Sequence, residues 1–349
     1  MLYVKMQHDL RSRRVIVFFK GKKILVIGGT GTVGRNVIKH LQMQNPKLIK
    51  VFSRDEYRQH LLKNELGNND QIQYIIGDVR NYDRLESAMQ GIDYVFHLAA
   101  MKHVPACEAN PFEAVLTNII GTKNVIHAAI KNKVKKMVYT STDKAISPTN
   151  TYGATKLIAE KIIQSSVALG DNSTIIACVR FGNIIGSRGS VVPLFKNQII
   201  NDRKITATDL NMTRFMMTVD EATMLTMKAL EKAKGGDIFV LKMPVITLKD
   251  LATVTIEETC HKYNIPKDEI TIENIGLRPG EKMYEELMTY DESKIAWELP
   301  DMYVLPSNSS GLEKRKDSKR VMIGTYSSMG QEPLNNMQLR SLLKEASLI

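Results

Sequence analysis

The 349-residue sequence contains little cysteine and no long apolar run, and each scarcity excludes a class of protein. Its three cysteines, Cys107, Cys178 and Cys260, lie far apart and lack metal-ligand spacing. Such a set argues against a disulfide framework or a metal site, and is typical of reduced thiols in a cytoplasmic protein. No apolar stretch approaches the roughly 20 residues that span a bilayer. We therefore predict a cytoplasmic protein with no stable membrane insertion and no bound metal.

Aromatic residues are also few, at 6%, whereas basic residues are in excess. Lysine and arginine number 48 against 37 acidic residues, a net charge of +11. This balance favours an anionic partner, either a nucleic acid or an anionic cofactor and substrate. Because the basic residues form no patch interleaved with aromatic ones, we expect no nucleic-acid binding. With 43% hydrophobic residues, the chain can bury the core of one large domain or two smaller ones.

The first 20 residues are basic and contain one short apolar run, at 15–19. They lack a convincing signal-peptide core and cleavage site. We expect residues 1–20 to be a ragged N-terminal extension, with weak contact with a membrane surface as the alternative.

From residue 21 to 182, short apolar runs alternate with amphipathic stretches. Strands are predicted at 23–27, 48–53, 71–76, 94–98, 136–141 and 174–180, and helices from the glycine turn to about 43 and at 82–89, 111–131 and 152–169. Such alternation predicts an α/β fold with a doubly wound parallel sheet. Beyond Gly182 the pattern loosens, which predicts a smaller substrate-binding region at 183–305 and a C-terminal tail at 306–349 with one short helix at 334–346.

A glycine-rich segment, G-G-T-G-T-V-G at Gly28–Gly34, follows the first predicted strand and opens the first helix. Gly28, Gly31 and Gly34 have G-x-x-G-x-x-G spacing. Glycine lets backbone N–H groups approach a pyrophosphate, and the helix N-terminus adds positive potential. In this position the motif predicts a Rossmann-like dinucleotide-binding domain over residues 21–182.

The residues after the second strand favour NADP over NAD. An acidic residue there binds the ribose 2′-hydroxyl of NAD, whereas this chain has Ser53 and Arg54 before Asp55. A guanidinium suits a 2′-phosphate, although Asp55 keeps NAD as the alternative. Asp78 ends the third strand, where it would accept a hydrogen bond from the adenine amino group or cap the next helix.

Tyr152 and Lys156 lie four residues apart on a predicted helix and therefore share one face. A nearby ammonium favours the phenolate and lowers the tyrosine pKa. Such a pair can take a proton from an alcohol while hydride leaves for a nicotinamide. Placed after a Rossmann-like half, this pair predicts an oxidoreductase-type site.

These motifs resemble those of the extended short-chain dehydrogenases/reductases, which also share H-L-A-A (His97–Ala100), S-T-D-K (Ser141–Lys144) and R-P-G-E-K (Arg278–Lys282). More narrowly, the chain is similar to the soluble inverting 4,6-dehydratases of UDP-N-acetylglucosamine, from flagellin-glycan and capsule pathways. Shared with them are S-R-D-E, A-A-x-K-H-V-P, S-T-D-K-A, R-x-G-N-x-x-G-S-R-G-S-V-V-P and M-T-R-F. The resemblance covers roughly residues 20–300.

The resemblance implies a chemistry for the segment after the fifth strand. Related dehydratases of dTDP-glucose have an Asp-Glu pair where this chain has Asp143–Lys144. Tyr152 would take the proton of the carbon-4 hydroxyl while hydride passes to NADP+. Lys144 would take the carbon-5 proton, and Asp143 would protonate the departing carbon-6 hydroxyl. Return of the hydride to carbon 6 and reprotonation of carbon 5 on the opposite face give UDP-2-acetamido-2,6-dideoxy-β-L-arabino-hex-4-ulose.

Two residue roles stay open at this stage. Lys144 can act as a base only if burial, Lys156 or other basic neighbours lower its pKa; otherwise it binds the phosphate or acetamido group. Thr142 would hydrogen-bond the carbon-4 oxygen or simply cap the strand end.

The resemblance also implies the ligand contacts. The expected cofactor-binding residues are Gly28, Thr30, Gly31, Thr32, Val33, Gly34, Ser53, Arg54, Asp55, Asp78, Val79, Leu98, Ala99, Ala100, Lys102, Tyr152 and Lys156. The expected UDP-sugar contacts are Lys102, Asn183, Arg188, Val191, Arg214, Arg278 and Glu281. Relatives of this kind form dimers or hexamers, so a homo-oligomer is expected.

Two other readings of the sequence remain. A 4-epimerase or a retaining 4,6-dehydratase would use the same scaffold. A noncatalytic NADP-binding sensor would keep the nucleotide site without turnover, although the intact Tyr152 and Lys156 argue against it.

Overall fold

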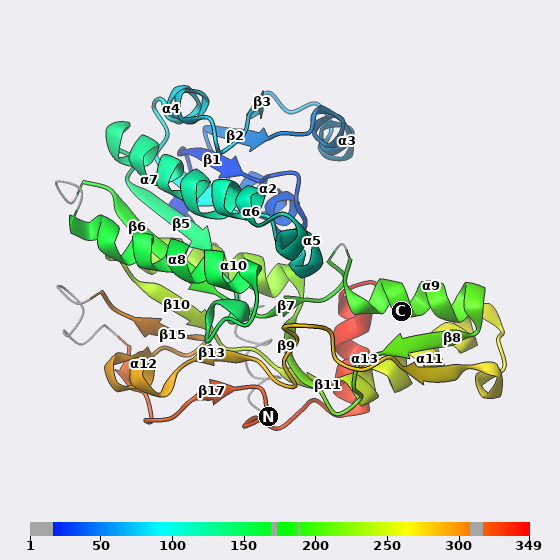
Figure 1. Cartoon of the computed structure of the whole chain (residues 1–349). Coiled ribbons are helices and arrows are strands. Elements are labelled where there is room, and N and C mark those ends of the chain that lie inside the picture. Colours follow the sequence, from blue (N-terminus) through cyan, green and yellow to red (C-terminus); the bar gives the residue numbers. More distant parts are fainter. Residues whose placement is uncertain (1–16, 169–172, 188, 308–316) are drawn as a thin grey trace.

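A ten-stranded sheet organises the larger part of the molecule, in a computed structural model that describes residues 17–168, 173–187, 189–307 and 317–349. Its strand order is β16-β14-β15-β10-β6-β5-β4-β1-β2-β3 (Figure 1). Its strands are β1 (Lys23–Ile27), β2 (Leu48–Ser53), β3 (Ile72–Ile76), β4 (Tyr94–His97), β5 (Lys136–Thr140), β6 (Ile175–Arg180), β10 (Ile238–Leu241), β14 (Trp297–Glu298), β15 (Met302–Leu305) and β16 (Lys319–Arg320). In the part of the sheet between β3 and β10, each strand runs parallel to the strand next to it.

Helices cover the sheet in two groups. In the first, α2 (Thr32–Gln42) packs against α10 (Val219–Lys232); in the second, α7 (Gly121–Lys131) packs against α4 (Tyr82–Met89) and α8 (Thr151–Ser165). The strand order reverses between β1 and β4, and in such sheets ligands bind at the carboxyl ends of the strands beside this switch. The predicted doubly wound α/β fold is therefore confirmed.

The six strands predicted before Gly182 are all present, with ends within one residue of the prediction. The predicted helix at 111–131 is divided into α6 (Pro111–Val115), a π-helical turn η2 (Leu116–Ile120) and α7. Two helices were not predicted, α3 (Glu56–Leu66) and α5 (Val104–Ala109). The remaining short turns are η1 (Val17–Phe19), η3 (Asp143–Ala145), η4 (Ser166–Ala168) and η5 (Lys267–Glu269).

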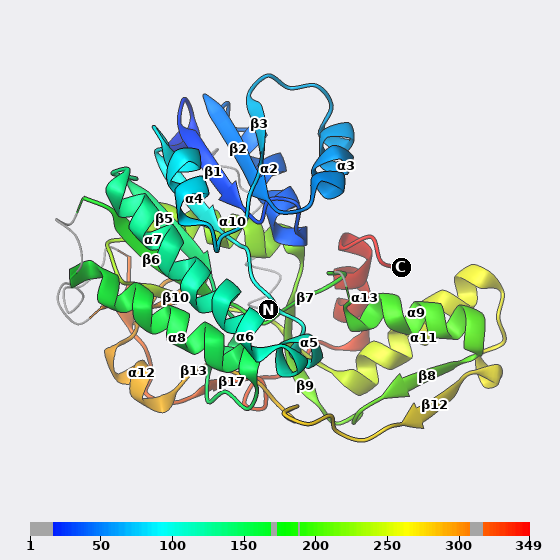
Figure 2. The same ribbon diagram turned by 45° about the horizontal axis from the view of Figure 1, so that its top comes forward.

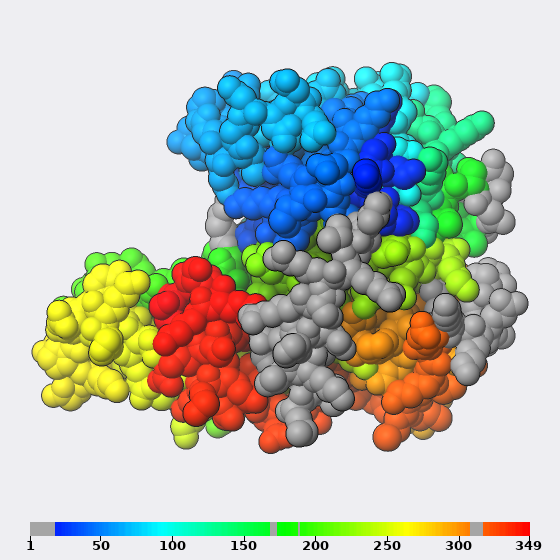
Figure 3. All heavy atoms as spheres, turned by 180° about the vertical axis from the view of Figure 1, so that it is seen from behind, coloured from blue at the N-terminus to red at the C-terminus, as the bar shows by residue number. Residues whose placement is uncertain are grey.

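A second lobe has its own hydrophobic core and projects to one side (Figures 1 and 3). It contains α9 (Val191–Asp202), α11 (Leu248–Tyr263) and the C-terminal α13 (Asn336–Glu345), with the parallel pair β8 (Lys204–Ala207) and β12 (Thr271–Asn274) at its far end (Figure 2). A three-stranded sheet contains β7 (Asn183–Ile184), β9 (Thr213–Met217) and β11 (Val245–Thr247). β13 (Glu286–Met288) pairs with β17 (Tyr326–Ser327), and α12 (Tyr290–Ile295) contacts β15.

The predicted division of the chain at Gly182 is not a boundary of the large sheet. β10, β14 and β15 come from the range assigned to the substrate-binding region, and β16 comes from the tail. The tail also supplies α13 to the second lobe. Residues 1–16 of the expected extension lie outside the described residues, whereas Phe19 is buried in the main core. In the part of the chain that the structure describes, no helix is both long and apolar enough to cross a membrane.

Candidate active site

The glycine turn after β1 leaves space that side chains would fill. Gly28 has φ +82°, and a Cβ there would lie 2.8 Å from the Ala99 nitrogen. At Gly34 a Cβ would lie 2.5 Å from the Gly28 carbonyl oxygen. The turn leads into α2, whose N-cap Gly31 provides no side-chain cap, so the first N–H groups of the helix have no capping oxygen. The close approach and the uncapped N–H groups fit a dinucleotide pyrophosphate.

Acidic and basic side chains meet beyond β2 and β3. Asp55 caps α3, accepting from the Arg58 nitrogen at 3.0 Å, so its carboxylate already has a structural role. The Arg54 guanidinium is 60% exposed and lies 3.9 Å from Asp78. Asp78 accepts from the Arg80 backbone and side chain. The suggestion that Asp78 caps the next helix is wrong, because Asn81 caps α4.

The segment after β5 folds into the short turn η3 and gathers polar side chains. Asp143 is 1% exposed and its Oδ1 accepts from the Thr142 hydroxyl at 2.9 Å. Lys144 Nζ lies 3.0 Å from Asp143 Oδ1 and 3.3 Å from Glu285 Oε1. Glu285 precedes β13, far away in sequence, and is 4% exposed. Asp143, Lys144 and Glu285 are called the acid–base cluster below.

Tyr152 and Lys156 come from the first turns of α8, which Asn150 caps by accepting from the Gly153 nitrogen at 2.9 Å. Both are buried, at 9% and 2% exposure. The helix packs tightly on η3, since a Cβ at Gly153 would lie 2.1 Å from the Lys144 carbonyl oxygen. The structure therefore brings Tyr152 beside the acid–base cluster.

The electrostatics of the site differ from the prediction in two respects. Burial raises the pKa of Tyr152 to about 12, and the main opposing effect is the charge of Lys144, not of Lys156. Lys156 Nζ instead donates to the Thr140 carbonyl at 2.6 Å and lies 4.0 Å above the Tyr139 ring. Burial lowers the pKa of Lys156 to about 8.

The lowering of the Lys144 pKa that a role as base requires is absent. Burial alone would lower the pKa of Lys144, but the charges of Asp143 and Glu285 raise it above its ordinary value. In this structure Lys144 is therefore an ammonium held between two carboxylates, and it needs a route for losing a proton before it can act as a base.

Behind the site, a buried ion-pair network joins α8 to the sheet. Arg180, at the end of β6, lies 2.6 Å from Glu160 Oε2 and 3.0 Å from Glu292 Oε2, and it donates to the Leu287 carbonyl. Arg180 and Glu160 are each 1% exposed. Because Glu160 follows Lys156 by one helical turn, this network fixes the helix that carries Tyr152 and Lys156.

Replacing Arg180 by methionine should destabilise the protein by about 3–5 kcal/mol, because Glu160 would stay buried without its guanidinium. Urea denaturation measures this loss. The control is Arg340→Met, which breaks the half-exposed pairs of Arg340 with Glu257 and Glu258 and should cost at most about 1 kcal/mol. Equal losses in the two variants would contradict a structural role for the buried network.

The R-P-G-E-K segment lies against the loop between η3 and α8. Lys282 Nζ donates to the Ile146 carbonyl at 2.9 Å, and the Thr149 hydroxyl donates to the Gly280 carbonyl at 2.7 Å. Glu281 lies 3.7 Å from Arg214 and accepts from the Arg278 nitrogen. Three predicted substrate contacts are thus brought together beside the acid–base cluster.

The other predicted ligand contacts are more scattered. Lys102 is exposed beyond β4, Asn183 begins β7 and Val191 begins α9. Arg188 lies outside the described residues.

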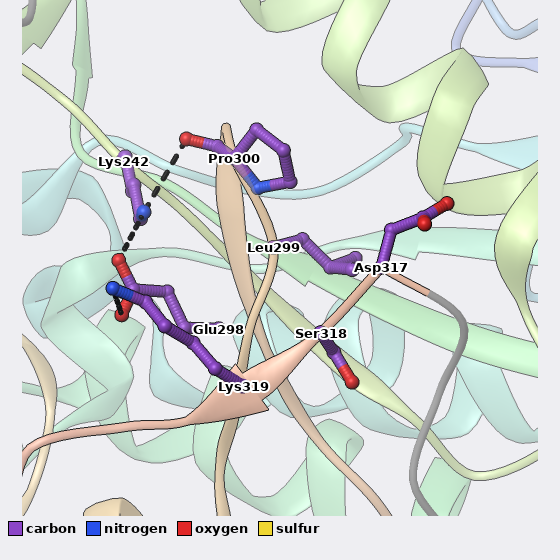
Figure 4. A pocket seen from close by; sticks show the side chains of 7 residues that line it. All are labelled: Lys242, Glu298, Leu299, Pro300, Asp317, Ser318 and Lys319. Atoms are coloured by element: carbon purple, nitrogen blue, oxygen red, sulfur yellow. Dashed lines mark hydrogen bonds and ion pairs between the residues drawn. The ribbon is translucent and has the colours of Figure 1, made fainter.

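A separate surface pocket of about 430 Å³ lies next to β14 and β16 and shares no residue with the acid–base cluster. Lys242 lines this pocket and donates to Glu298 and to the Pro300 carbonyl (Figure 4).

Comparisons with known proteins agree with this architecture. The chain is 56% identical to Pen from Bacillus thuringiensis, whose X-ray structure superposes with a TM-score of 0.89 over 95% of this chain and all of that one. It is 46% identical to an uncharacterized membrane protein of Methanocaldococcus jannaschii, over 95% of this chain and 98% of that protein. A UDP-glucose 4-epimerase of Rickettsia rickettsii is 38% identical over 93% of this chain and 96% of its own length.

The fold is that of the extended short-chain dehydrogenases/reductases, a fold that known nucleotide-sugar dehydratases and epimerases share. A dTDP-glucose 4,6-dehydratase of Streptomyces venezuelae shares this fold, with a TM-score of 0.65 over 75% of this chain and 86% of that one at 17% identity. Residues 24–307 match the polysaccharide biosynthesis protein family, and the chain belongs to that family.

Proposed function

We propose that the protein is a UDP-N-acetylglucosamine 4,6-dehydratase of the inverting, 5-epimerising type, with tightly bound NADP+. The observation that carries the proposal is the acid–base cluster packed against the turn that holds Tyr152. Inversion of configuration at carbon 4 needs only a group that exchanges a proton with the carbon-4 hydroxyl. Elimination of water also needs groups that exchange protons at carbon 5 and carbon 6, and this cluster would provide them.

The residues that would hold the cofactor fit it by shape and charge. Gly28, Gly31 and Gly34 would admit the pyrophosphate, and Arg54 would bind a 2′-phosphate. When bound, NADP+ supplies a hydride acceptor that is regenerated in each turnover. Lys156 is fixed by the Thr140 carbonyl beneath the site, where it would orient the cofactor.

Tyr152 would take the proton of the carbon-4 hydroxyl, with Thr142 beside it as a hydrogen-bond partner for the same oxygen. The ketone then makes the carbon-5 proton acidic. Lys144, as its neutral amine, would take that proton, and Asp143 would give a proton to the departing carbon-6 hydroxyl, so that one water leaves. Carbon 6 would regain the hydride removed from carbon 4, and reprotonation of carbon 5 from the opposite face would invert that centre and give UDP-2-acetamido-2,6-dideoxy-β-L-arabino-hex-4-ulose.

The cations near the R-P-G-E-K segment support a nucleotide-diphosphate substrate. Arg214 and Arg278 would bind phosphate oxygens, Glu281 would accept from the uridine ribose, and Asn183, Val191, Lys102 and Arg188 are further proposed contacts. A net charge of +11 is consistent with an anionic ligand. The product would supply surface-polysaccharide or glycan biosynthesis, the process that the family name states.

A 4-epimerase is the second candidate, because Rickettsia relatives with 38–39% identity are named UDP-glucose 4-epimerases. Both activities begin with oxidation at carbon 4, and only the dehydratase loses water. Mass spectrometry of the purified protein incubated separately with UDP-N-acetylglucosamine and UDP-glucose separates them. The proposal predicts loss of one water from UDP-N-acetylglucosamine. With chromatographic separation before the mass measurement, a new peak of unchanged mass would favour the epimerase, and no new peak would favour a noncatalytic sensor.

Cofactor choice depends on Arg54 in this proposal. Replacing Arg54 by alanine should weaken binding of NADP+ by about tenfold or more, because charge-assisted hydrogen bonds to the 2′-phosphate are lost. Binding of NAD+ should change little. Calorimetric titration with both dinucleotides measures the two affinities. The control is Arg58→Ala, which removes the neighbouring arginine that pairs with Asp55; equal weakening of both dinucleotides by Arg54→Ala would contradict the assignment.

A homo-oligomer, a dimer or a hexamer, remains a prediction. Exposed apolar side chains on neighbouring helices are consistent with it: Phe112, Leu116 and Ile120 from α6 and η2, and Ile158 from α8. A cytoplasmic location likewise remains a prediction.

A further inference from the structure

Glu285 was not among the residues that the sequence indicated, yet it lies in the acid–base cluster. Its Oε1 is 3.3 Å from Lys144 Nζ, the same ammonium that lies 3.0 Å from Asp143 Oδ1. The backbone on either side is fixed: the Glu285 nitrogen donates to the Ser328 hydroxyl at 3.0 Å, and the Ser328 nitrogen donates back to the Glu285 carbonyl at 2.9 Å. The Ser328 hydroxyl is in turn 2.9 Å from the Thr213 hydroxyl. The carboxylate is therefore delivered to Lys144 by a rigid segment.

The cluster has more carboxylate oxygens than it has donors. Asp143 Oδ2 and Glu285 Oε2 are buried, and neither has a hydrogen-bond partner among the described residues. Such atoms are uncommon in folded proteins and often mark a functional site. Gly182 lies next to Asp143, where a Cβ would be 3.1 Å from Oδ2. Free acceptor atoms remain beside Lys144 that could exchange protons with a bound sugar.

We infer that Glu285 is a positioning residue for the elimination, which holds Lys144 in place and determines when Lys144 carries a proton. The inference rests on the proposed function and adds a residue from the second half of the chain to the reacting pair. Lys144 faces Asp143 from its own turn, Glu285 from the segment before β13, Tyr152 from α8 and Arg214 from β9. Of these, Asp143 and Glu285 stabilise the ammonium and Arg214 opposes it.

The direction of the effect follows from charge. Glu285 is one of two anions that favour the protonated form of Lys144, so its removal lets Lys144 lose its proton at lower pH. If the neutral amine is the base, the rate rises with pH as that amine forms. In a plot of rate against pH, loss of Glu285 should therefore move the rising limb toward lower pH. A residue with only a structural role would reduce the rate without moving the limb.

The test compares Glu285→Gln with Glu286→Gln in the full-length protein. The control removes the same charge at the next position, Glu286, which begins β13 and is half-buried. Loss of water from UDP-N-acetylglucosamine at saturating substrate is followed by mass spectrometry across the neutral to alkaline range. The rising limb of Glu285→Gln is expected to shift down by at least about one pH unit, a tenfold change in proton affinity, with no shift in Glu286→Gln.

An unshifted limb in Glu285→Gln, or an equal shift in both variants, overturns the inference while leaving the proposed function intact. Absence of water loss in the unmodified protein is the distinct result that overturns the proposed function. If Glu285→Gln does not fold, Glu285→Asp keeps the charge at a longer distance from Lys144. Its limb should shift down by a smaller amount, and a lower rate with no shift would reject the role for Glu285.

Discussion

Phenylalanine at position 152 should reduce turnover by about a hundred- to ten-thousand-fold, the range that a positioned acid–base group contributes. The ring would stay in its buried position, so folding should be kept and only the phenolic oxygen would be lost. The measured quantity is the rate of product formation at saturating substrate.

Tyr139→Phe provides the matched control for this variant. Tyr139 is buried beneath Lys156, and its hydroxyl has no hydrogen-bond partner among the residues described. Removal of that hydroxyl keeps the ring under the ammonium and should leave turnover within a few-fold of the unmodified rate, because no hydrogen bond is broken. Similar losses in Tyr152→Phe and Tyr139→Phe would show that Tyr152 has no special chemical role.

The second large effect is expected at Gly153. In Gly153→Ala, the new methyl group would lie 2.1 Å from the Lys144 carbonyl oxygen and 3.1 Å from Pro148 Cβ. Backbone has to move to relieve this contact, at a cost of about 1–3 kcal/mol of stability. The movement separates the turn of Lys144 from the helix of Tyr152, and a displacement of about 1 Å can reduce a rate by a hundredfold. Turnover should fall by that order.

Gly324→Ala is the control for Gly153→Ala, since a Cβ at Gly324 would meet no atom within 4 Å. Its turnover and unfolding midpoint should stay close to those of the unmodified protein. Thermal unfolding of Gly153→Ala separates lost activity from lost folding. A folded Gly153→Ala protein with full turnover would mean that the contact between η3 and α8 does not determine the reacting geometry.

Local patterns in the sequence predicted the parts of the fold that depend on near neighbours. The apolar strands before Gly182 and the glycine turn were located because period and spacing alone determine them. The pair Asp143–Lys144 was singled out from a contiguous motif, and its acid and base roles, which the resemblance implies, remain a proposal. By contrast, β10 and α10 were assigned to the substrate-binding region. Nothing local shows that the strand beginning at Ile238 pairs with β6, which ends at Arg180, because the strand–helix pattern loosens between them.

The electrostatics could not be predicted for a similar reason. Glu285 reaches Lys144 only because its segment is anchored to Ser328, and Arg180 pairs with Glu160 across the sheet. The i,i+4 spacing of Tyr152 and Lys156 correctly placed both on one helix, but it did not show that Thr140 holds the Lys156 ammonium. The protonation state of a buried group depends on contacts between residues that are far apart in the sequence. Such contacts cannot be read from a single sequence before the fold is known.

Proton NMR of the product formed from UDP-N-acetylglucosamine in deuterium oxide tests the central claim most directly. The account predicts a 4-keto-6-deoxy sugar that has gained solvent deuterium at carbon 5 and has the inverted configuration there, because Lys144 removes that proton and the centre is reprotonated from the other face. A product that keeps its original hydrogen and configuration at carbon 5, or that differs from the substrate only at carbon 4, would contradict it.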